Sequence, residues 1–209
     1  CDYSLASRTM CFDIRKKEWS SEIISAAGLD MNIFPPLKLA DEIAGTIKCD
    51  LAEKLGVSSS CSILVSGHDQ MMAALGSGMV LPGMANDGMG TAECVTLLLD
   101  KIPSNRDFFH NNFCVVPYII PGLYITYAFI TTGGALLEWH KDKLSPLEAR
   151  VMQSEKRNYF QEYSKADVSL PTSLLVLPHF SGSGTPFLDN KSKGVIIGLT
   201  QETTKEEIF

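Results

Sequence analysis

An almost wholly apolar segment, residues 113–130, constrains the fold of this chain more than any other feature of its sequence. Its length is close to the ~18 residues that identify a membrane-spanning helix. Pro121 and Gly122 interrupt it, however, and the residues on either side are rich in the β-branched and aromatic side chains that favour strands. We therefore predict a hairpin of two buried strands, Phe113–Ile120 and Leu123–Ile130, and no membrane span.

The composition narrows the classes of function. The chain has 209 residues, of which 45% are hydrophobic and 20% charged, as is usual for a globular protein with one large or two small domains. Its formal charge of -6 argues against binding to nucleic acid, because phosphate backbones require a dense Lys/Arg face. Six cysteines without a C-x-x-C pair argue against a metal site. Cys61 and Cys114 lie in apolar runs, which predicts buried thiols in a reducing, cytoplasmic environment.

Strand and helix patterns alternate along the chain, which favours an α/β fold. We predict strands at residues 9–14, 62–66, 93–99, 174–177 and 193–199, with those at 62–66 and 174–177 buried. We predict helices at residues 19–27, 51–55, 69–76, 134–141 and 146–165, and a last helix capped by Thr204. Val80–Gly83 is the best candidate for a linker, so domains are expected at 1–82 and 83–209. Both ends suggest an internal fragment, because position 1 is not Met and an amphipathic helix begins just before residue 209.

A short polar turn, Ser66-Gly67-His68-Asp69-Gln70, is the sharpest local feature. It follows a predicted strand and opens a predicted helix, which is where α/β proteins place reactive groups. The positive end of the helix dipole keeps a carboxylate ionised at such a position, and an ionised Asp69 can accept a proton from a substrate hydroxyl. The alternative is that Asp69 is a plain helix N-cap, a role in which Asp is among the preferred residues.

Two glycine-rich turns are candidates for binding phosphate. In Asp87-Gly88-Met89-Gly90-Thr91 the glycines would let backbone N–H groups approach an anion, and the Thr91 hydroxyl would add a donor. Thr131-Thr132-Gly133-Gly134 opens a predicted helix and offers a second anion-binding helix start. Both segments are also consistent with ordinary tight turns. The chain has no G-x-x-x-x-G-K-[ST], so a P-loop is excluded.

Other catalytic patterns are incomplete. The four histidines do not form H-E-x-x-H, and Ser181-Gly182-Ser183-Gly184 does not fit the G-x-S-x-G of a serine nucleophile. We interpret the segment around Ser181 as a loop with a functional or structural turn.

Taken in order, these segments resemble the FGGY family of carbohydrate kinases. The resemblance covers essentially the whole chain. It rests on residues 2–14 (D-x-S-x-A-S-R-T…F-D-I), 67–76 (G-H-D-Q…A-A-L-G), 90–91 (G-T), 133–139 (G-G…W) and 178–199 (P-x-x-x-G-x-x-x-P…D…G…G-L). Single motifs of this length are weak, whereas five in the family's order are difficult to obtain by chance.

The resemblance implies an α/β, ribonuclease H-like (actin-like ATPase) fold of two domains, which this chain covers only in part. Residues 1–82 would be the C-terminal part of the sugar-binding domain, and residues 83–209 the first part of the domain that binds ATP with Mg²⁺. It implies Asp69 as catalytic base, substrate contacts from His68 and Gln70, and nucleotide phosphate contacts from the two glycine-rich turns (Gly90, Thr91, Gly133, Gly134). The family's first phosphate hairpin and its adenine-binding segment would lie outside this chain, so we expect the fragment alone to be inactive.

The resemblance leaves the substrate open within the class of small sugars and polyols. The segments at residues 90–94 and 178–186 depart from the glycerol kinase pattern, which favours xylulose, gluconate or a related open-chain substrate. A homodimer is compatible with the sequence. The alternatives are a catalytically silent relative that senses sugar or nucleotide, another actin-like ATPase, and a plain structural domain.

Overall fold

The computed structural model describes residues 1–165 and 172–209 and divides into two units. Unit 1 comprises Cys1–Asn86, Thr96–Arg106 and Cys114–Tyr127, and unit 2 comprises Asp87–Val95, Asp107–Phe113 and Ala128–Phe209. The chain thus passes between the units several times. The domain boundary expected between residues 82 and 83 concerns the whole protein and remains a prediction.

Helices and strands alternate along much of the described chain, as the sequence predicts. The helices are α1 (Tyr3–Ser7), α2 (Ser21–Ala26), the 3₁₀ turn η1 (Met31–Ile33), α3 (Cys49–Leu55), α4 (Asp69–Gly76), α5 (Asp107–His110), α6 (Gly134–Trp139), the π-helical turn η2 (His140–Leu144), α7 (Pro146–Ser154), α8 (Tyr159–Tyr163) and α9 (Lys205–Ile208). The strands are β1 (Phe12–Asp13), β2 (Glu18–Trp19), β3 (Ile43–Thr46), β4 (Ser62–Leu64), β5 (Ala85–Met89), β6 (Glu93–Leu99), β7 (Cys114–Pro117), β8 (Tyr124–Ile130), β9 (Leu175–Leu177) and β10 (Val195–Ile197).

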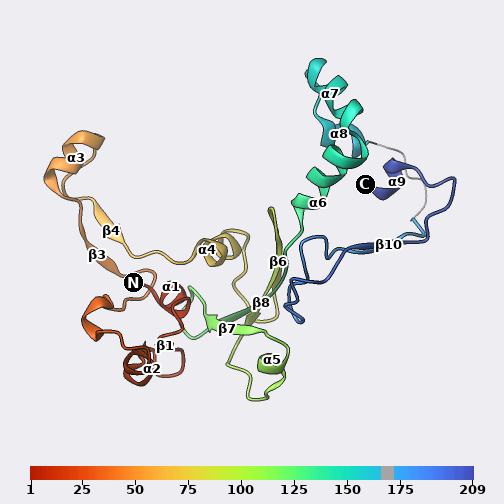
Figure 1. Cartoon of the computed structure of the whole chain (residues 1–209). Coiled ribbons are helices and arrows are strands. Elements are labelled where there is room, and N and C mark those ends of the chain that lie inside the picture. Colours follow the sequence, from red (N-terminus) through yellow and green to blue (C-terminus); the bar gives the residue numbers. More distant parts are fainter. Residues whose placement is uncertain (166–171) are drawn as a thin grey trace. The chain divides into compact units, whose positions relative to one another are not determined.

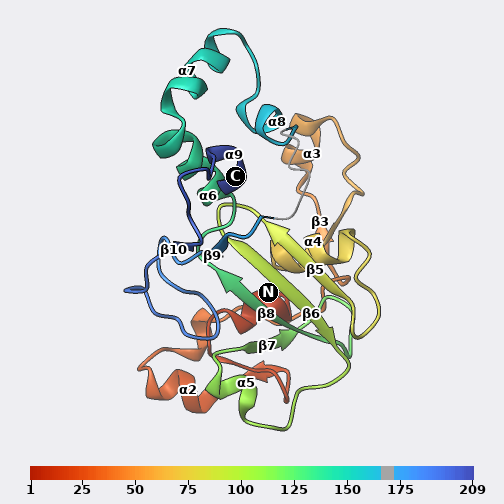
Figure 2. The ribbon, with the colours of Figure 1, turned by 90° about the vertical axis from the view of Figure 1, so that its right-hand side faces the viewer.

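The largest sheet has four strands in the order β5-β6-β8-β7. Figure 2 shows these strands side by side, and Figure 1 labels β6, β7 and β8 of the same sheet. Three two-stranded antiparallel sheets accompany it, β1–β2, β3–β4 and β9–β10.

The predicted hairpin is confirmed, but its first strand ends at Pro117 and both strands are buried only in part. Strands β7 and β8 pair antiparallel, with Cys114 opposite Tyr127 and Pro117 opposite Tyr124. Gly122 has φ = 86°, a value that glycine adopts without strain, and the Leu123 N–H donates to the Ile120 carbonyl to close the turn. None of the helices in residues 1–165 and 172–209 is long and apolar enough to cross a membrane.

The core of unit 1 lies between helix α4 and the hairpin. Its buried members are Met71, Ala74, Met79, Leu98, Val116, Tyr118 and Ile125. Tyr118 packs here because its hydroxyl donates to the Met79 carbonyl at 2.9 Å, which satisfies the polar end of a buried ring. Helix α4 has the predicted bounds 69–76. Because this core holds the helix, the backbone of its first residue, Asp69, has a defined position.

The prediction of a single helix at residues 146–165 is wrong. Helix α7 ends at Ser154, and α8 begins at Tyr159. Lys156 adopts φ = 57°, which ends the helical path, and the Asn158 side chain accepts the Gln161 N–H to cap a new helix. Local capping here overrides a continuous amphipathic pattern.

The start of the helix predicted at residues 19–27 is also corrected. Trp19 belongs to strand β2, opposite Phe12. The Ser20 hydroxyl accepts the Ile23 N–H and caps α2, which then starts at Ser21. Of the expected apolar face, Ile24 is buried, whereas Ile23 is 46% exposed.

Two strands predicted to be buried are exposed. All residues of β4 and β9 are exposed in the structure, because each strand lies in a two-stranded sheet and has one neighbouring strand. Cys61 is exposed and Cys114 half-buried, so the expectation of buried thiols fails at both positions.

Other predicted bounds and caps are confirmed. Strand β6 has its predicted bounds, α3 ends before Gly56 at φ = 66°, and Thr204 caps α9.

We predict that replacing Ile125 by Ala in the whole protein lowers the free energy of unfolding by about 2–5 kcal/mol, because the side chain is fully buried and leaves a cavity. The same replacement at Ile33, which is 64% exposed, is the control and should change stability by less than about 0.5 kcal/mol. Denaturant unfolding measures both. Equal effects would show that the hairpin does not form the core.

Candidate functional site

Asp69 occupies the first position of helix α4, directly after the N-cap residue His68. Its side chain is 96% exposed. Within residues 1–165 and 172–209 the carboxylate makes one hydrogen bond, from the Gln70 N–H to Oδ1 at 2.7 Å. The N-cap alternative for Asp69 is therefore wrong, since His68 holds that position. The carboxylate is left open to a ligand.

His68 and Gln70 flank this carboxylate. The His68 Nδ1 atom lies 3.3 Å from Asp69 Oδ1 without hydrogen-bonding geometry, so the contact is an ion pair only when the imidazole is protonated. Nδ1 is buried and has no hydrogen-bond partner in the described part of the chain. The structure thus brings the three predicted residues together as one turn, with Asp69 as its exposed acceptor.

The turn is held from behind by helix α1. The His68 N–H donates to Ser4 Oγ at 2.8 Å, and the Ser4 hydroxyl donates to Asp2 Oδ2 at 2.5 Å. A Cβ atom on Gly67 would lie 2.1 Å from Ile119 Cδ1 and 3.2 Å from Ser4 Oγ, so the close approach requires glycine. Sequence reasoning assigned no role to Asp2 and Ser4. The sequence feature that could have indicated such a role is their position in the D-x-S motif at residues 2–4.

The same N-terminal segment makes a second long-range contact through Arg8. Its Nη1 donates to the Tyr127 hydroxyl on β8 at 2.6 Å. Burial raises the pKa of Tyr127 to about 12, partly offset by Arg8. The phenol thus stays protonated at neutral pH and fixes an exposed guanidinium.

The two glycine-rich turns meet in unit 2. The Gly133 N–H donates to the Thr91 carbonyl at 2.9 Å, and the Gly134 N–H to the Gly90 carbonyl at 2.7 Å. All four residues predicted to contact phosphate therefore form one structure. The glycines are needed for packing, because a Cβ atom on Gly134 would lie 2.8 Å from the Gly90 oxygen.

Thr91 carries two free donors of this double turn. The Gly90 N–H is bonded to the Ala92 carbonyl, and the N–H groups of Gly133 and Gly134 are engaged as described. Among residues 1–165 and 172–209, the N–H and hydroxyl of Thr91 have no hydrogen-bond partner, and the residue is exposed. An anion at this turn would find two donors on one residue.

The loop from Pro178 to Pro186 anchors the end of β8. The Thr131 hydroxyl donates to the Gly182 carbonyl at 2.9 Å, and the Thr132 hydroxyl donates to the Pro178 carbonyl. A Cβ atom on Gly184 would lie 1.7 Å from the Phe129 oxygen, so the loop backbone touches the strand. The loop therefore has a structural role and sets where α6 begins.

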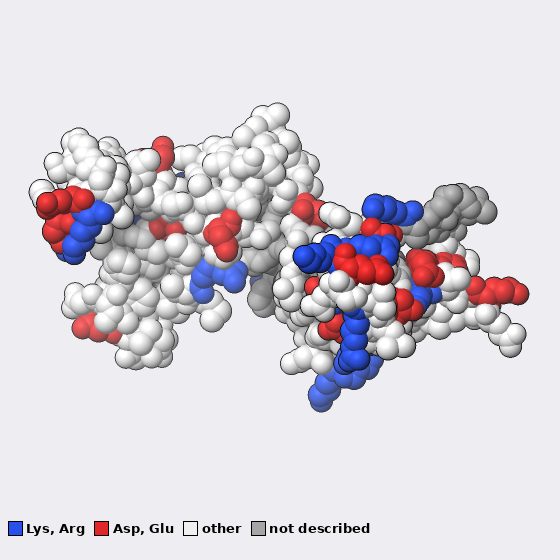
Figure 3. Space-filling view, turned by 90° about the horizontal axis from the view of Figure 1, so that it is seen from above, with Lys and Arg blue, Asp and Glu red and all other residues white. Residues whose placement is uncertain are grey.

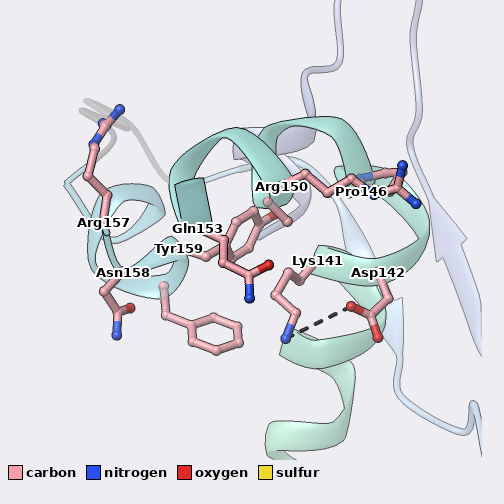
Figure 4. A pocket seen from close by; sticks show the side chains of 10 residues that line it. Lys141, Asp142, Pro146, Arg150, Gln153, Arg157, Asn158 and Tyr159 are labelled. Atoms are coloured by element: carbon pink, nitrogen blue, oxygen red, sulfur yellow. Dashed lines mark ion pairs between the residues drawn. The ribbon is translucent and has the colours of Figure 1, made fainter. Parts of the chain in front are cut away.

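Two cavities of similar volume lie in the described part of unit 2. One, of about 490 Å³, includes Gly133 and is largely apolar, with Trp139 and Phe180 packed edge-to-face at 4.8 Å. The other, of about 480 Å³, lies among η2, α7 and α8 (Figure 4). Of its three cations, Lys141 and Arg157 are paired with carboxylates and Arg150 also lines the cavity, whereas none of the predicted site residues does.

Charged groups of both signs lie close together on the face shown in Figure 3. Arg157 and Lys165 of unit 2 each form an ion pair with Glu162. Exposed pairs of this kind contribute little to stability.

We predict that Gly134→Ala in the whole protein lowers the free energy of unfolding by about 1–3 kcal/mol, because the added methyl group overlaps the Gly90 carbonyl oxygen. Gly76→Ala is the control, since a Cβ atom there meets nothing within 4 Å. It should be neutral or stabilising by up to about 1 kcal/mol. Thermal unfolding of both variants tests the contact, and a harmless Gly134→Ala would contradict it.

Two segments of the chain match models of known protein families. Residues 1–76 match the model of the N-terminal domain of the FGGY family of carbohydrate kinases. Residues 88–209 match the C-terminal domain of the same family.

Individual relatives agree with this assignment. A glycerol kinase of Desulforamulus reducens is 31% identical over the full chain, which spans 39% of that relative. The crystal structure of a xyloylose kinase from Brucella ovis matches 99% of this chain and 40% of its own, with a TM-score of 0.80 at 22% identity. The crystal structure of Plasmodium falciparum glycerol kinase with ADP matches 99% of this chain and 39% of its own, with a TM-score of 0.77 at 19% identity. The chain thus spans about two fifths of the length of these relatives. It belongs to the FGGY family of carbohydrate kinases and carries part of that family's two-domain, ribonuclease H-like α/β fold.

Proposed function

We propose that the whole protein transfers a phosphoryl group from ATP to a hydroxyl of a small sugar or polyol, with Asp69 as the general base. The observation that carries the proposal is the Asp69 carboxylate. It is almost fully exposed, yet it stands on a helix whose next turn, through Met71 and Ala74, is buried in the core of unit 1. A catalytic base needs both access to substrate and a fixed position.

Asp69 would orient the acceptor hydroxyl and take its proton as the oxygen attacks phosphorus. The carboxylate stands at the positive end of the α4 helix dipole, which is a favourable place for a negative charge. His68 and Gln70, adjacent to Asp69 in the turn, would contact other hydroxyl groups of the substrate. Phosphoryl transfer depends mainly on such positioning and on electrostatic stabilisation of the transferred group.

Thr91 would bind the nucleotide phosphates, because its N–H and hydroxyl are free donors in the double turn. Gly90, Gly133 and Gly134 would act by holding Thr91 in place through the bonds between the turns. ATP with Mg²⁺ supplies the transferred phosphoryl group. The described residues contain no group of three or more His, Cys, Asp or Glu that could hold a metal ion, and Mg²⁺ commonly binds through substrate phosphates.

The substrate is a sugar or polyol of the size handled by the relatives. Glycerol kinases and a xyloylose kinase are both among them, and the sequence departures at residues 90–94 and 178–186 favour xylulose or gluconate over glycerol. An intact and accessible Asp69 favours turnover over a silent sensor.

We predict that the whole protein releases ADP from MgATP with one member of a panel of ketoses, pentoses, sugar acids and polyols, and that Asp69→Asn lowers kcat by roughly 10²–10⁴-fold. The amide cannot accept the proton. Asp50→Asn is the matched control, since Asp50 also lies in the first turn of a helix, α3, and should leave kcat unchanged. Unchanged turnover in Asp69→Asn would refute the base, and no turnover with any substrate despite nucleotide binding would favour a sensor.

We predict that Thr91→Val raises the KM for ATP by roughly tenfold, because one hydrogen bond to a charged phosphate is lost. The KM for the sugar should stay within about twofold, a change that lies inside the range of surface substitutions. Thr46→Val, at an exposed position of β3, is the control. Steady-state kinetics with ATP varied at saturating sugar measures the effect, and an unchanged KM would remove Thr91 from the nucleotide site.

A further inference from the structure

We propose that Ser4, directed by Asp2, is a positioning residue that holds the Asp69 turn in its reactive place. The inference rests on the proposed role of Asp69 as base. It adds two residues from the start of the chain. In this scheme they do not touch the substrate and act through the backbone of His68.

The direction of each hydrogen bond follows from the carboxylate. An ionised carboxylate only accepts hydrogen bonds. Asp2 Oδ2 accepts the Ser4 N–H at 2.6 Å and the Ser4 hydroxyl at 2.5 Å, while Oδ1 accepts the Leu5 N–H at 3.2 Å. The Ser4 proton is thus committed to Asp2, and an oxygen lone pair is left for the His68 N–H at 2.8 Å.

Burial makes this chain of bonds specific. Asp2 is 2% and Ser4 1% exposed, so water cannot replace either partner. The Ser4–His68 bond joins residues 64 positions apart, and it forms because Gly67 lets the turn approach α1 and Ile119. Buried polar groups that are fully paired fix a single arrangement of their surroundings.

The bond acts one residue away from the proposed base. The His68 N–H belongs to the residue that precedes Asp69 and caps α4, so a shift of that amide also moves the start of the helix. The core holds α4 through Met71 and Ala74, one turn further on, and leaves the cap to be fixed by Ser4. A misplacement of about 1 Å at a reacting group can lower the rate by about 10²-fold.

The test compares variants of the whole protein. Ser4→Ala should lower kcat by about 10- to 100-fold, with KM for sugar and ATP within about threefold, and should raise the rate of hydrogen exchange at the His68 amide at least about tenfold. Ser4→Thr keeps the hydroxyl and should restore both values. Ser7→Ala is the matched control on the same helix, because the Ser7 hydroxyl bonds the Tyr3 carbonyl and not the turn.

Asp2→Asn is the second variant, and it keeps the helix cap because Asn caps as well as Asp. Its side chain has one oxygen in place of two, so it should reduce kcat in the same direction. This variant decides the question where Ser4→Ala does not fold.

Asp69→Asn, measured in parallel, separates this inference from the proposed function. If Asp69→Asn keeps full turnover, the base assignment fails, while exchange at His68 still reports on Ser4. If Asp69→Asn is inactive and Ser4→Ala shows native kcat and native exchange, the positioning role is refuted. An equal loss of kcat in Ser7→Ala would also refute it, because the effect would then belong to α1 as a whole.

Discussion

The packing of helix α4 against the β7–β8 hairpin is the contact on which the rest of unit 1 depends. Met71 and Ala74 on one face of α4 are buried with Val116, Tyr118 and Ile125, and this apolar contact fixes the helix without using any group at its N-terminus. The first residue of α4, Asp69, is therefore free to carry an exposed polar side chain. Asp69 combines a fixed backbone with an exposed carboxylate for this reason, and a general base requires that combination.

The sequence predicted well those elements whose signals are local and consistent. The hairpin at residues 113–130, strand β6 and helix α4 each combine a clear hydrophobic pattern with a turn residue at the boundary. The failures have two causes. At residues 154–159 a competing cap, Asn158, ended a pattern that looked continuous. At β4 and β9 the composition indicated burial, but burial depends on which layers cover a strand, and no local pattern encodes that.

For the candidate site, too, the sequence predicted some features and missed others. Short motifs located Asp69, Thr91 and the paired glycines, because catalytic turns have characteristic residue types. They did not indicate which groups are already bonded. The N–H groups of Gly133 and Gly134 are occupied by carbonyls some forty positions earlier, and Ser4 reaches the His68 amide across 64 positions. Pairings over such distances exist only in the folded chain, so the sequence predicts the members of a site better than it predicts their partners.

Asp2 and Asp69 show how burial assigns different roles to one residue type. Asp2 is 2% exposed and its two oxygens accept three hydrogen bonds, so its hydrogen-bonding capacity is used in holding helix α1 and Ser4. Asp69 is exposed and accepts one hydrogen bond from the described residues, so its carboxylate keeps hydrogen-bonding capacity for a ligand. The double turn follows the same logic, with Gly133 and Gly134 bonded and Thr91 free. In both places the groups that hold the structure have used their hydrogen-bonding capacity, and those that remain unsatisfied are the ones available for chemistry.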